Sequence, residues 1–236
     1  AKHKNIYPRV DPKKLDAELK KNRPNERVLL CFMTDPYNHL DVEKKLTRQT
    51  LEVLLQHDVP ISVLTKGGKR SLRDHDLLCS FTDVQYGITA VFEDEAERAL
   101  MEPSAAPTSE RFEVLKTYHD TGIKTYVSFE PVYHPDQTLR MMEQYQDIID
   151  LYKIGRLNHV KNTTDWRDFG DRAVIMTRTM GKDAYFKDDL RAAISIPLTE
   201  KESTPFDDRH STQAKTACRH VQKTLAQEEP DCGGTW

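Results

Sequence analysis

The sequence predicts an α/β fold built on a parallel sheet, and three observations carry that prediction. Apolar, β-rich runs alternate with amphipathic helical stretches from about residue 12 to residue 160. The apolar runs are continuous rather than alternating, which is typical of buried parallel strands. The segments between them are long enough for crossover helices. This pattern fits either an open doubly wound sheet or part of a (β/α) barrel, and periodicity does not separate the two.

The chain opens on a helix, where an α/β repeat would open on a strand. Asp11-Pro12 is a helix-start signal, and Leu15 and Leu19 lie four residues apart on one helical face. Five strands then alternate with helices, and the helix near residue 120 ends at Gly122. The predicted strands are 27–35, 60–66, 84–92, 123–132 and 151–158, and the predicted helices are 11–22, 42–57, 71–81, 109–122 and 136–150.

The chain divides into three regions by composition. Residues 1–160 carry the five strands, and residues 161–197 form a C-terminal αβα appendage that begins with a helix over 166–180. Residues 198–236 contain few aliphatic side chains among many polar ones, which predicts a largely disordered tail.

Composition excludes several function classes. The net charge is −3, so the whole chain gives no electrostatic reason to bind nucleic acid or an anionic membrane. There is no apolar run near 18 residues and no secretory signal pattern, so we expect no membrane span and a cytoplasmic location. The four cysteines show no CxxC spacing and predict reduced thiols. The nine histidines show no zinc-binding spacing.

Polar residues follow each predicted strand. Ligand sites of parallel α/β folds lie at the carboxyl ends of the strands, so this asymmetry favours a small-molecule site there. The competing interpretation is that strands end in turn residues in any protein. The strand-end segments are 34–37, 65–68, 87–89, 128–131 and 153–158.

Three groups of residues have both a functional and a structural interpretation. Lys66 followed by Gly67-Gly68 could bring an ammonium and backbone N–H groups to an anion, or could be a rim lysine beside a turn. The SLRDHD segment, residues 71–76, is most simply a charge cluster at a helix start. Arg111 lies in the first turn of a predicted helix, where a cation opposes the helix dipole and needs a partner, for which Glu102 is a candidate.

Four strings in one order resemble the radical S-adenosylmethionine (SAM) superfamily, and most closely its spore photoproduct lyase-like branch. They are TDPYN, LTKGGKRSLRDHDLL, the long segment from YGITAVF to SFEPV, and LYKIGRLN. The likeness runs from about residue 10 to residue 195, and the EPxAPxxxR element from Glu102 to Arg111 is its most specific part. The resemblance implies an α/β fold of a particular kind: a partial (β/α)6 TIM-like barrel with a C-terminal helical appendage and a polar tail.

The same resemblance implies cofactors, namely SAM and a four-iron four-sulfur cluster that reduces it to a 5'-deoxyadenosyl radical for hydrogen abstraction from substrate. Glu102 matches the family position that braces the barrel top with Arg111. The family positions that approach the cofactor are matched by Asp35, Lys66, Gly87, Thr89, Arg111, Lys153 and Asn158. Nucleic acid as a substrate rests on the family analogy alone.

One family element is missing from the sequence. The family holds its cluster with a CxxxCxxC loop, and no such triplet is present. We expect that loop, and the missing opening strand, N-terminal to Ala1. Three hypotheses remain: the body of a radical SAM enzyme, inactive as the chain stands; a non-catalytic barrel fragment that binds SAM or a nucleotide; and an unrelated α/β protein with a phosphate site at Gly67-Gly68.

Overall fold

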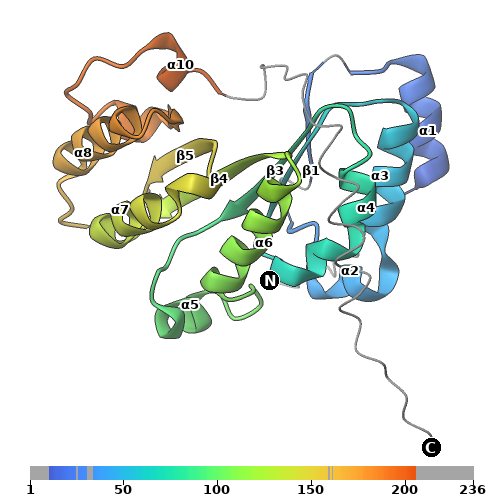
Figure 1. Ribbon diagram of the computed structural model, residues 1–236, viewed down its shortest axis with the longest axis horizontal. Coiled ribbons are helices and arrows are strands. Elements are labelled where there is room, and N and C mark those ends of the chain that lie inside the picture. The colour runs from blue at the N-terminus through green and yellow to red at the C-terminus, as the bar shows by residue number, and fades with distance from the viewer. Residues whose placement is uncertain (1–10, 25, 31–33, 159, 161, 206–236) are drawn as a thin grey trace, which may run out of the picture.

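The computed structural model describes residues 11–24, 26–30, 34–158, 160 and 162–205 (Figure 1). Its helices are α1 Pro12–Lys21, α2 His39–Lys44, α3 Leu46–Gln56, α4 His75–Leu78, α5 Glu95–Met101, α6 Thr108–Asp120, α7 Pro135–Gln144, α8 Trp166–Thr179, α9 Asp188–Arg191 and α10 Glu200–Ser203, with 3-10 turns η1 Gly68–Asp74 and η2 Gln146–Ile148. Its strands are β1 Val28–Leu30, β2 Ile61–Thr65, β3 Val84–Thr89, β4 Lys124–Val132, β5 Leu151–Arg156 and β6 Asp183–Phe186.

The strand order decides between the two architectures that the sequence left open. The described strands form one parallel sheet in the order β1-β2-β3-β4-β5-β6. A doubly wound sheet reverses its strand order at a switch point, whereas a barrel adds each strand beside the previous one. The fold is therefore a partial barrel. Helices α1 and α3 lie at one end of the sheet and α7 and α8 at the other (Figure 1).

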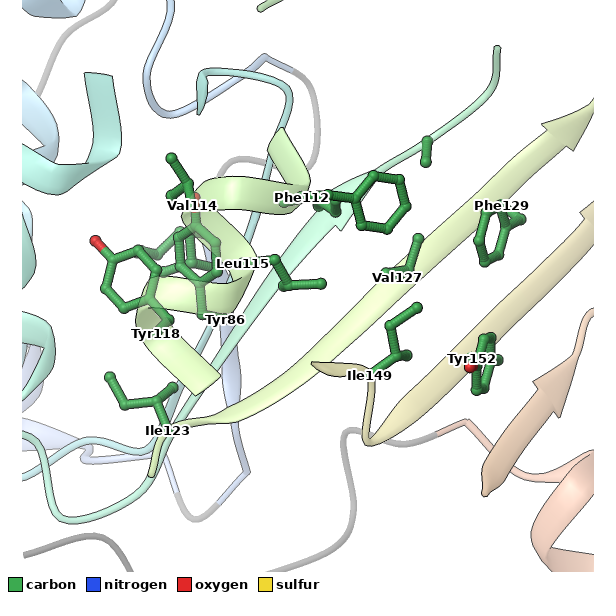
Figure 2. Packing of buried hydrophobic residues seen from close by; sticks show 14 of the residues in the cluster. Tyr86, Phe112, Val114, Leu115, Tyr118, Ile123, Val127, Phe129, Ile149 and Tyr152 are labelled. Atoms are coloured by element: carbon green, nitrogen blue, oxygen red, sulfur yellow. The ribbon is translucent and has the colours of Figure 1, made fainter. Parts of the chain in front are cut away.

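The two faces of the sheet differ in chemistry. One face packs against the helices and carries large apolar side chains, among them Tyr86, Val127, Phe129 and Tyr152 (Figure 2). Helix α6 covers the middle of this face. Its buried residues recur at helical spacing, as at Leu115 and Tyr118, and so form one apolar side that packs on the sheet. Strand alternation turns the intervening residues to the opposite, concave face, where many are polar.

Four elements differ from their predicted forms. The helix expected over 71–81 begins as the 3-10 turn η1, and its α-helical part is only α4, His75–Leu78. The helix expected over 42–57 is two helices, α2 and α3, because Lys45 adopts a left-handed conformation with φ of 50°. The helix expected to reach residue 150 ends at Gln144 and continues as η2. The short strand of the expected appendage is β6, which pairs with β5 and so extends the same sheet.

The first residues of the expected tail are folded. Helix α10 has a capping box in which Thr199 and Glu202 each accept from the other's backbone N–H. The remainder of the tail, 206–236, lies outside the described residues, and so do Cys31, Cys218 and Cys232. Cys79 is disulfide-bonded, so the prediction of reduced thiols is wrong for this residue. No helix in the described part of the chain has the length and apolar character needed to cross a membrane.

Candidate functional site at the carboxyl ends of the strands

A row of polar residues crosses the concave face near the carboxyl ends of the strands. Thr89 of β3 is in register with Ser128 of β4, Ser128 with Lys153 of β5, and Lys153 with Tyr185 of β6. Residues in register on parallel strands point to the same side of the sheet, about 4.8 Å apart. The structure therefore brings the predicted residues Thr89 and Lys153 onto one surface and adds Ser128 and Tyr185 to them.

Asp35 and Lys66 meet at the β1–β2 end of this edge. The Asp35 carboxylate accepts from the Tyr37 N–H at 2.8 Å and the Thr65 hydroxyl at 2.7 Å through Oδ1, and from the Lys66 N–H at 2.6 Å through Oδ2. The bonds from Thr65 and Lys66 tie the segment after β1 to the end of β2, and the bond from Tyr37 holds the turn within that segment. Asp35 thus fixes the backbone at Lys66, a role that its position after an apolar strand alone did not reveal.

The Lys66 side chain belongs to an ionic network that is buried at Arg111 and reaches the surface at Lys66. Its ammonium donates to Oε1 of Glu102, whose Oε2 accepts from Arg111 Nη2 at 2.8 Å. Arg111 also donates from Nε to the Ala106 carbonyl at 2.8 Å and from Nη1 to the Thr89 carbonyl at 2.7 Å. The expected pairing of Arg111 with Glu102 is confirmed. The Arg111 side chain is 0% exposed, so it can act on a ligand only through Glu102.

The two cations set the protonation state of Glu102. Burial on its own would raise the pKa of this carboxyl, but hydrogen bonds from Lys66 and Arg111 outweigh it and hold the pKa below its usual value. Glu102 is therefore a carboxylate at neutral pH.

Gly67 and Gly68 serve packing. A Cβ at Gly67 would lie 2.6 Å from Tyr37 Cβ, and one at Gly68, whose φ is +55°, would lie 2.5 Å from Ala106 Cβ. The N–H of the next residue, Lys69, donates to Glu110 Oε1 at 2.8 Å. A carboxylate thus takes the place that a phosphate would need, which favours the structural interpretation of the glycine pair.

A cavity of about 320 Å³ opens beside this network. It lies between the segment that follows β1 and the loop that joins α5 to α6. Its lining combines charged groups with a methionine at the mouth, and Met101 is 50% exposed. The lining residues are Asp35, Asn38, His39, Lys66, Arg70, Met101, Glu102, Pro103, Ser104 and Ala105.

Gly87 lies deeper on the concave face, under an aromatic ring. A Cβ at Gly87 would lie 2.3 Å from Tyr126 Cζ, so only glycine lets the ring cross β3. The Tyr126 hydroxyl accepts from Ser62 at 3.0 Å and donates to the Val63 carbonyl at 2.9 Å. The Lys153 ammonium lies 4.5 Å from the centre of the same ring. Gly87 therefore makes room for the tyrosine.

A second cavity, of about 260 Å³, opens at the β4–β6 end of the edge. The predicted residue Asn158 lines it, accepting from Arg156 Nε at 3.2 Å and donating to Asp189 Oδ2 at 2.6 Å. Glu130 and Lys187 form an ion pair at 2.5 Å in the same cavity. The sequence marked Glu130 only as part of a strand end. It gave no signal for Lys187, because that residue follows the strand assigned to the appendage.

The SLRDHD segment is a structural charge cluster, as its simplest interpretation predicted. Arg73 donates to Asp41 at 2.5 Å and to Asp74 at 3.0 Å, while Arg48 pairs with Asp76 at 2.8 Å. Asp74 is fully buried. The cluster ties η1 and α4 to α2 and α3, and its five charged side chains line neither cavity.

No group of three or more His, Cys, Asp and Glu side chains that could hold a metal ion occurs among the described residues. These residues do not fit a four-iron four-sulfur cluster, which needs several thiolates in one place. Cys79, the cysteine within the described ranges, lies beside His75 on α4 with its Sγ 3.6 Å from Nε2.

Comparison with known proteins bears on the fold. No known family model matches the chain. An uncharacterized protein of Methanocaldococcus jannaschii, MJ0683, is 30% identical over 107 residues, which are 45% of this chain and 40% of that protein. Streptococcus suis SuiB bound to S-adenosylmethionine matches 84% of this chain with a TM-score of 0.62 and 10% identity. The fold resembles the radical SAM partial barrel.

Two further SuiB structures have the same fold as this chain. SuiB bound to its precursor peptide SuiA matches with a TM-score of 0.61 and 10% identity over 79% of this chain, and SuiB alone with 0.60 and 12% over 83%. The chain spans 40% of the length of MJ0683 and 44–49% of that of SuiB. At these identities the structural likeness establishes a shared partial-barrel fold.

Proposed function

We propose that this chain binds S-adenosylmethionine along the carboxyl edge of its sheet, as the SAM-binding body of a radical SAM enzyme. One observation carries the proposal: two cavities with charged side chains in their lining lie at opposite ends of one strand edge, and the row Thr89, Ser128 and Lys153 lies on the strands between them. From β2 to β5 the edge spans three strand spacings, roughly 15 Å. An extended molecule with an amino acid at one end and a nucleoside at the other suits such an edge.

Lys66 is the residue best suited to the amino-acid end of that ligand. An ammonium has three donor hydrogens, and one of those on Lys66 serves Glu102. The Lys66 side chain is 34% exposed in the first cavity, so the others can reach a ligand carboxylate. Asp35 and Glu102 then act as positioning residues, because one fixes the Lys66 backbone and the other fixes its ammonium.

The nucleoside end is assigned to the second cavity. Asn158 and the backbone around Gly155 lie there, on the strand that the family resemblance places near adenine. Thr89 and Lys153 lie between the two ends on the concave face. Gly87 contributes by admitting Tyr126, whose buried ring lies beneath the Lys153 ammonium.

The radical reaction needs a cluster that the described residues do not fit, so the proposal for this chain is confined to binding and orienting SAM. Membership of the spore photoproduct lyase-like branch is supported by the four collinear strings, and lyase chemistry and a nucleic-acid substrate follow only from that branch. SuiB was crystallised with a precursor peptide, which makes a peptide the other substrate class to test.

Calorimetric titration of the full chain with SAM tests the proposal. We expect saturable binding that Lys66→Gln weakens about tenfold or more, since a charge-assisted hydrogen bond is lost. Lys69→Gln is the matched control, because Lys69 is 63% exposed and pairs with Glu113 on the surface. Absence of SAM binding to the folded chain, or equal losses in the two variants, contradicts the proposal.

The non-catalytic alternative predicts the same binding and differs in one measurement. Sequencing the DNA upstream of the codon for Ala1 separates the two, because the enzyme needs an in-frame CxxxCxxC triplet there. Such a triplet favours the enzyme, and SAM binding by a protein without it favours the binding module.

A further inference from the structure

Helices α2 and α5, which flank the first cavity, have their apolar and charged residues in reversed positions. A surface helix normally turns apolar side chains to the core and charged ones to solvent. The residue that α2 buries is Asp41, whereas Leu40 and Val42 are exposed. On α5, Leu100 is 79% exposed and Met101 is exposed beside it. We call Leu40, Val42, Leu100 and Met101 the α2–α5 surface.

Charged side chains attach these two helices to the rest of the protein. Asp41 accepts from the Thr47 N–H at 2.8 Å and from the Arg73 guanidinium at 2.5 Å. Helix α5 has no buried residue, and Glu97 joins it to His134 before α7 at 2.8 Å. The apolar side chains of α2 and α5 are therefore not needed to hold the helices in place, and they remain available to a partner.

The α2–α5 surface gathers most of the exposed apolar side chains at one place. Six large apolar side chains are exposed in the described part of the chain, and four of them belong to this surface. It borders the first cavity from two sides, because His39 of α2 and Met101 of α5 both line that cavity. Both helices lie on the lower side of the molecule in Figure 1. Exposed apolar side chains gathered in this way mark an interaction site.

The charges at the cavity mouth indicate what the partner carries. Both carboxylates of the lining are already bonded within the protein, Asp35 to the end of β2 and Glu102 to two cations, one of which is Lys66. Arg70 differs, because its Nη2 donates to a backbone carbonyl at 3.1 Å, its buried Nε has no partner, and no carboxylate of the described residues pairs with it. A guanidinium in this state favours a carboxylate from outside.

We propose that the α2–α5 surface docks a peptide segment of another protein in which apolar side chains lie next to a carboxylate. The apolar side chains pack on Leu40 and Leu100, and Arg70 receives the carboxylate. A membrane surface would select a face rich in Lys and Arg, whereas the exposed residues 43–45 of this face have a net charge of +1 and the whole chain has −3. The inference goes beyond the proposed function, since docking does not require bound SAM.

Fluorescence anisotropy with a labelled synthetic peptide tests the inference. The probe has leucines at helical spacing and a glutamate beside each leucine, and two comparison peptides carry lysine for glutamate or serine for leucine. We expect the full chain to bind the probe about tenfold more tightly than either comparison peptide. This is roughly the effect of one buried leucine or one charge-assisted hydrogen bond.

Variants of both helices locate the binding. Leu40→Ser and Leu100→Ser should each weaken probe binding about tenfold, because each removes one apolar contact. Arg70→Gln should remove the preference for glutamate over lysine. Ile175→Ser is the matched control, because Ile175 is an exposed apolar residue of α8, outside the α2–α5 surface, and should leave binding unchanged.

Several outcomes would overturn the inference. No saturable binding of the probe, equal affinity for the three peptides, or equal weakening by Leu100→Ser and Ile175→Ser contradicts peptide docking. Arg70→Gln that weakens SAM binding as much as Lys66→Gln does would assign Arg70 to the cofactor instead.

Other occupants of the surface have their own signatures. Loss of self-association in Leu100→Ser would assign the surface to a second copy, and loss of binding to phosphatidylcholine–phosphatidylserine vesicles would assign it to a lipid surface. Calorimetry with SAM is independent of these results, so Lys66-dependent SAM binding without peptide binding would leave the proposed function standing and this inference wrong.

Discussion

Arg111 has a guanidinium with no exposed surface, and its hydrogen bonds hold three segments together. They join α6, which carries Arg111, to the end of β3 and to Glu102 and Ala106 of the α5–α6 loop. A buried charge is tolerated only when it is paired and fully hydrogen-bonded. Glu102 provides the opposite charge, and its other oxygen accepts from the Lys66 ammonium. The position of the Lys66 ammonium therefore depends on Arg111, which is too deeply buried to touch a ligand.

Removing the Glu102 carboxylate should therefore destabilise the protein. We expect Glu102→Ala to lower the free energy of unfolding by about 3 kcal/mol, because it leaves Arg111 buried without a counter-charge. Urea denaturation of the purified variant measures this. Glu93→Ala is the control: Glu93 pairs with Arg140, which is 58% exposed and screened by solvent, so the loss should be much smaller. Equal losses would show that the buried network is not the source.

At the scale of single elements, the conformation or side chain of one or two residues sets where a helix begins and ends. Lys45, in a left-handed conformation, is both the residue that ends α2 and the residue that precedes α3. The sequence around it has no glycine or proline, so pattern alone predicted one continuous helix. The start of helix α10, by contrast, does have a local sequence signal, the capping box of Thr199 and Glu202. Glu202 is only 7% exposed.

Helix α10 should detach in acid. Hydrogen bonds from Arg178 outweigh burial and lower the pKa of Glu202 to about 2, compared with 4.5 for a free glutamate. A lowered carboxyl pKa stabilises the fold above pH 4.5, and this contribution is lost as the pH falls from 4.5 towards 2. Because Arg178 is 41% exposed, we expect on the order of 1–2 kcal/mol.

Urea unfolding of the native protein and of Glu202→Gln at several pH values measures this contribution. The difference in unfolding free energy should be largest above pH 5 and shrink as the pH is lowered. A difference that stays constant across this range would contradict the assignment to Glu202.

At the scale of the whole molecule, the sequential strand order leaves β1 at one edge of the described sheet. An apolar edge strand offers unpaired backbone groups to another chain. We expect concentration-dependent self-association in light scattering. Leu29→Lys should reduce it, because Leu29 is partly exposed on this strand. Ile175→Lys, the same change at a 57% exposed site on α8, should not. A monomer at all concentrations would contradict this prediction.

The α/β class, the helices and the strands could be predicted from the sequence because each depends on local periodicity. The predicted positions of β2, β3, β4 and β5 contain the observed strands. Among candidate site residues, the sequence could place Lys66, Thr89, Lys153 and Asn158 at strand ends. It could not show that Arg111 is buried, that the Asp35 carboxylate is bonded to the backbone, or that Gly87 lies under Tyr126.

The sequence by itself thus determined which segments are strands and helices and that polar groups gather where strands end, since both follow from neighbours along the chain. The tertiary structure alone decided the strand order and the pairs Lys66–Glu102 and Glu130–Lys187. Those pairs join residues 36 and 57 positions apart. Such contacts depend on how strands are arranged in space, which local hydrophobic patterns do not encode.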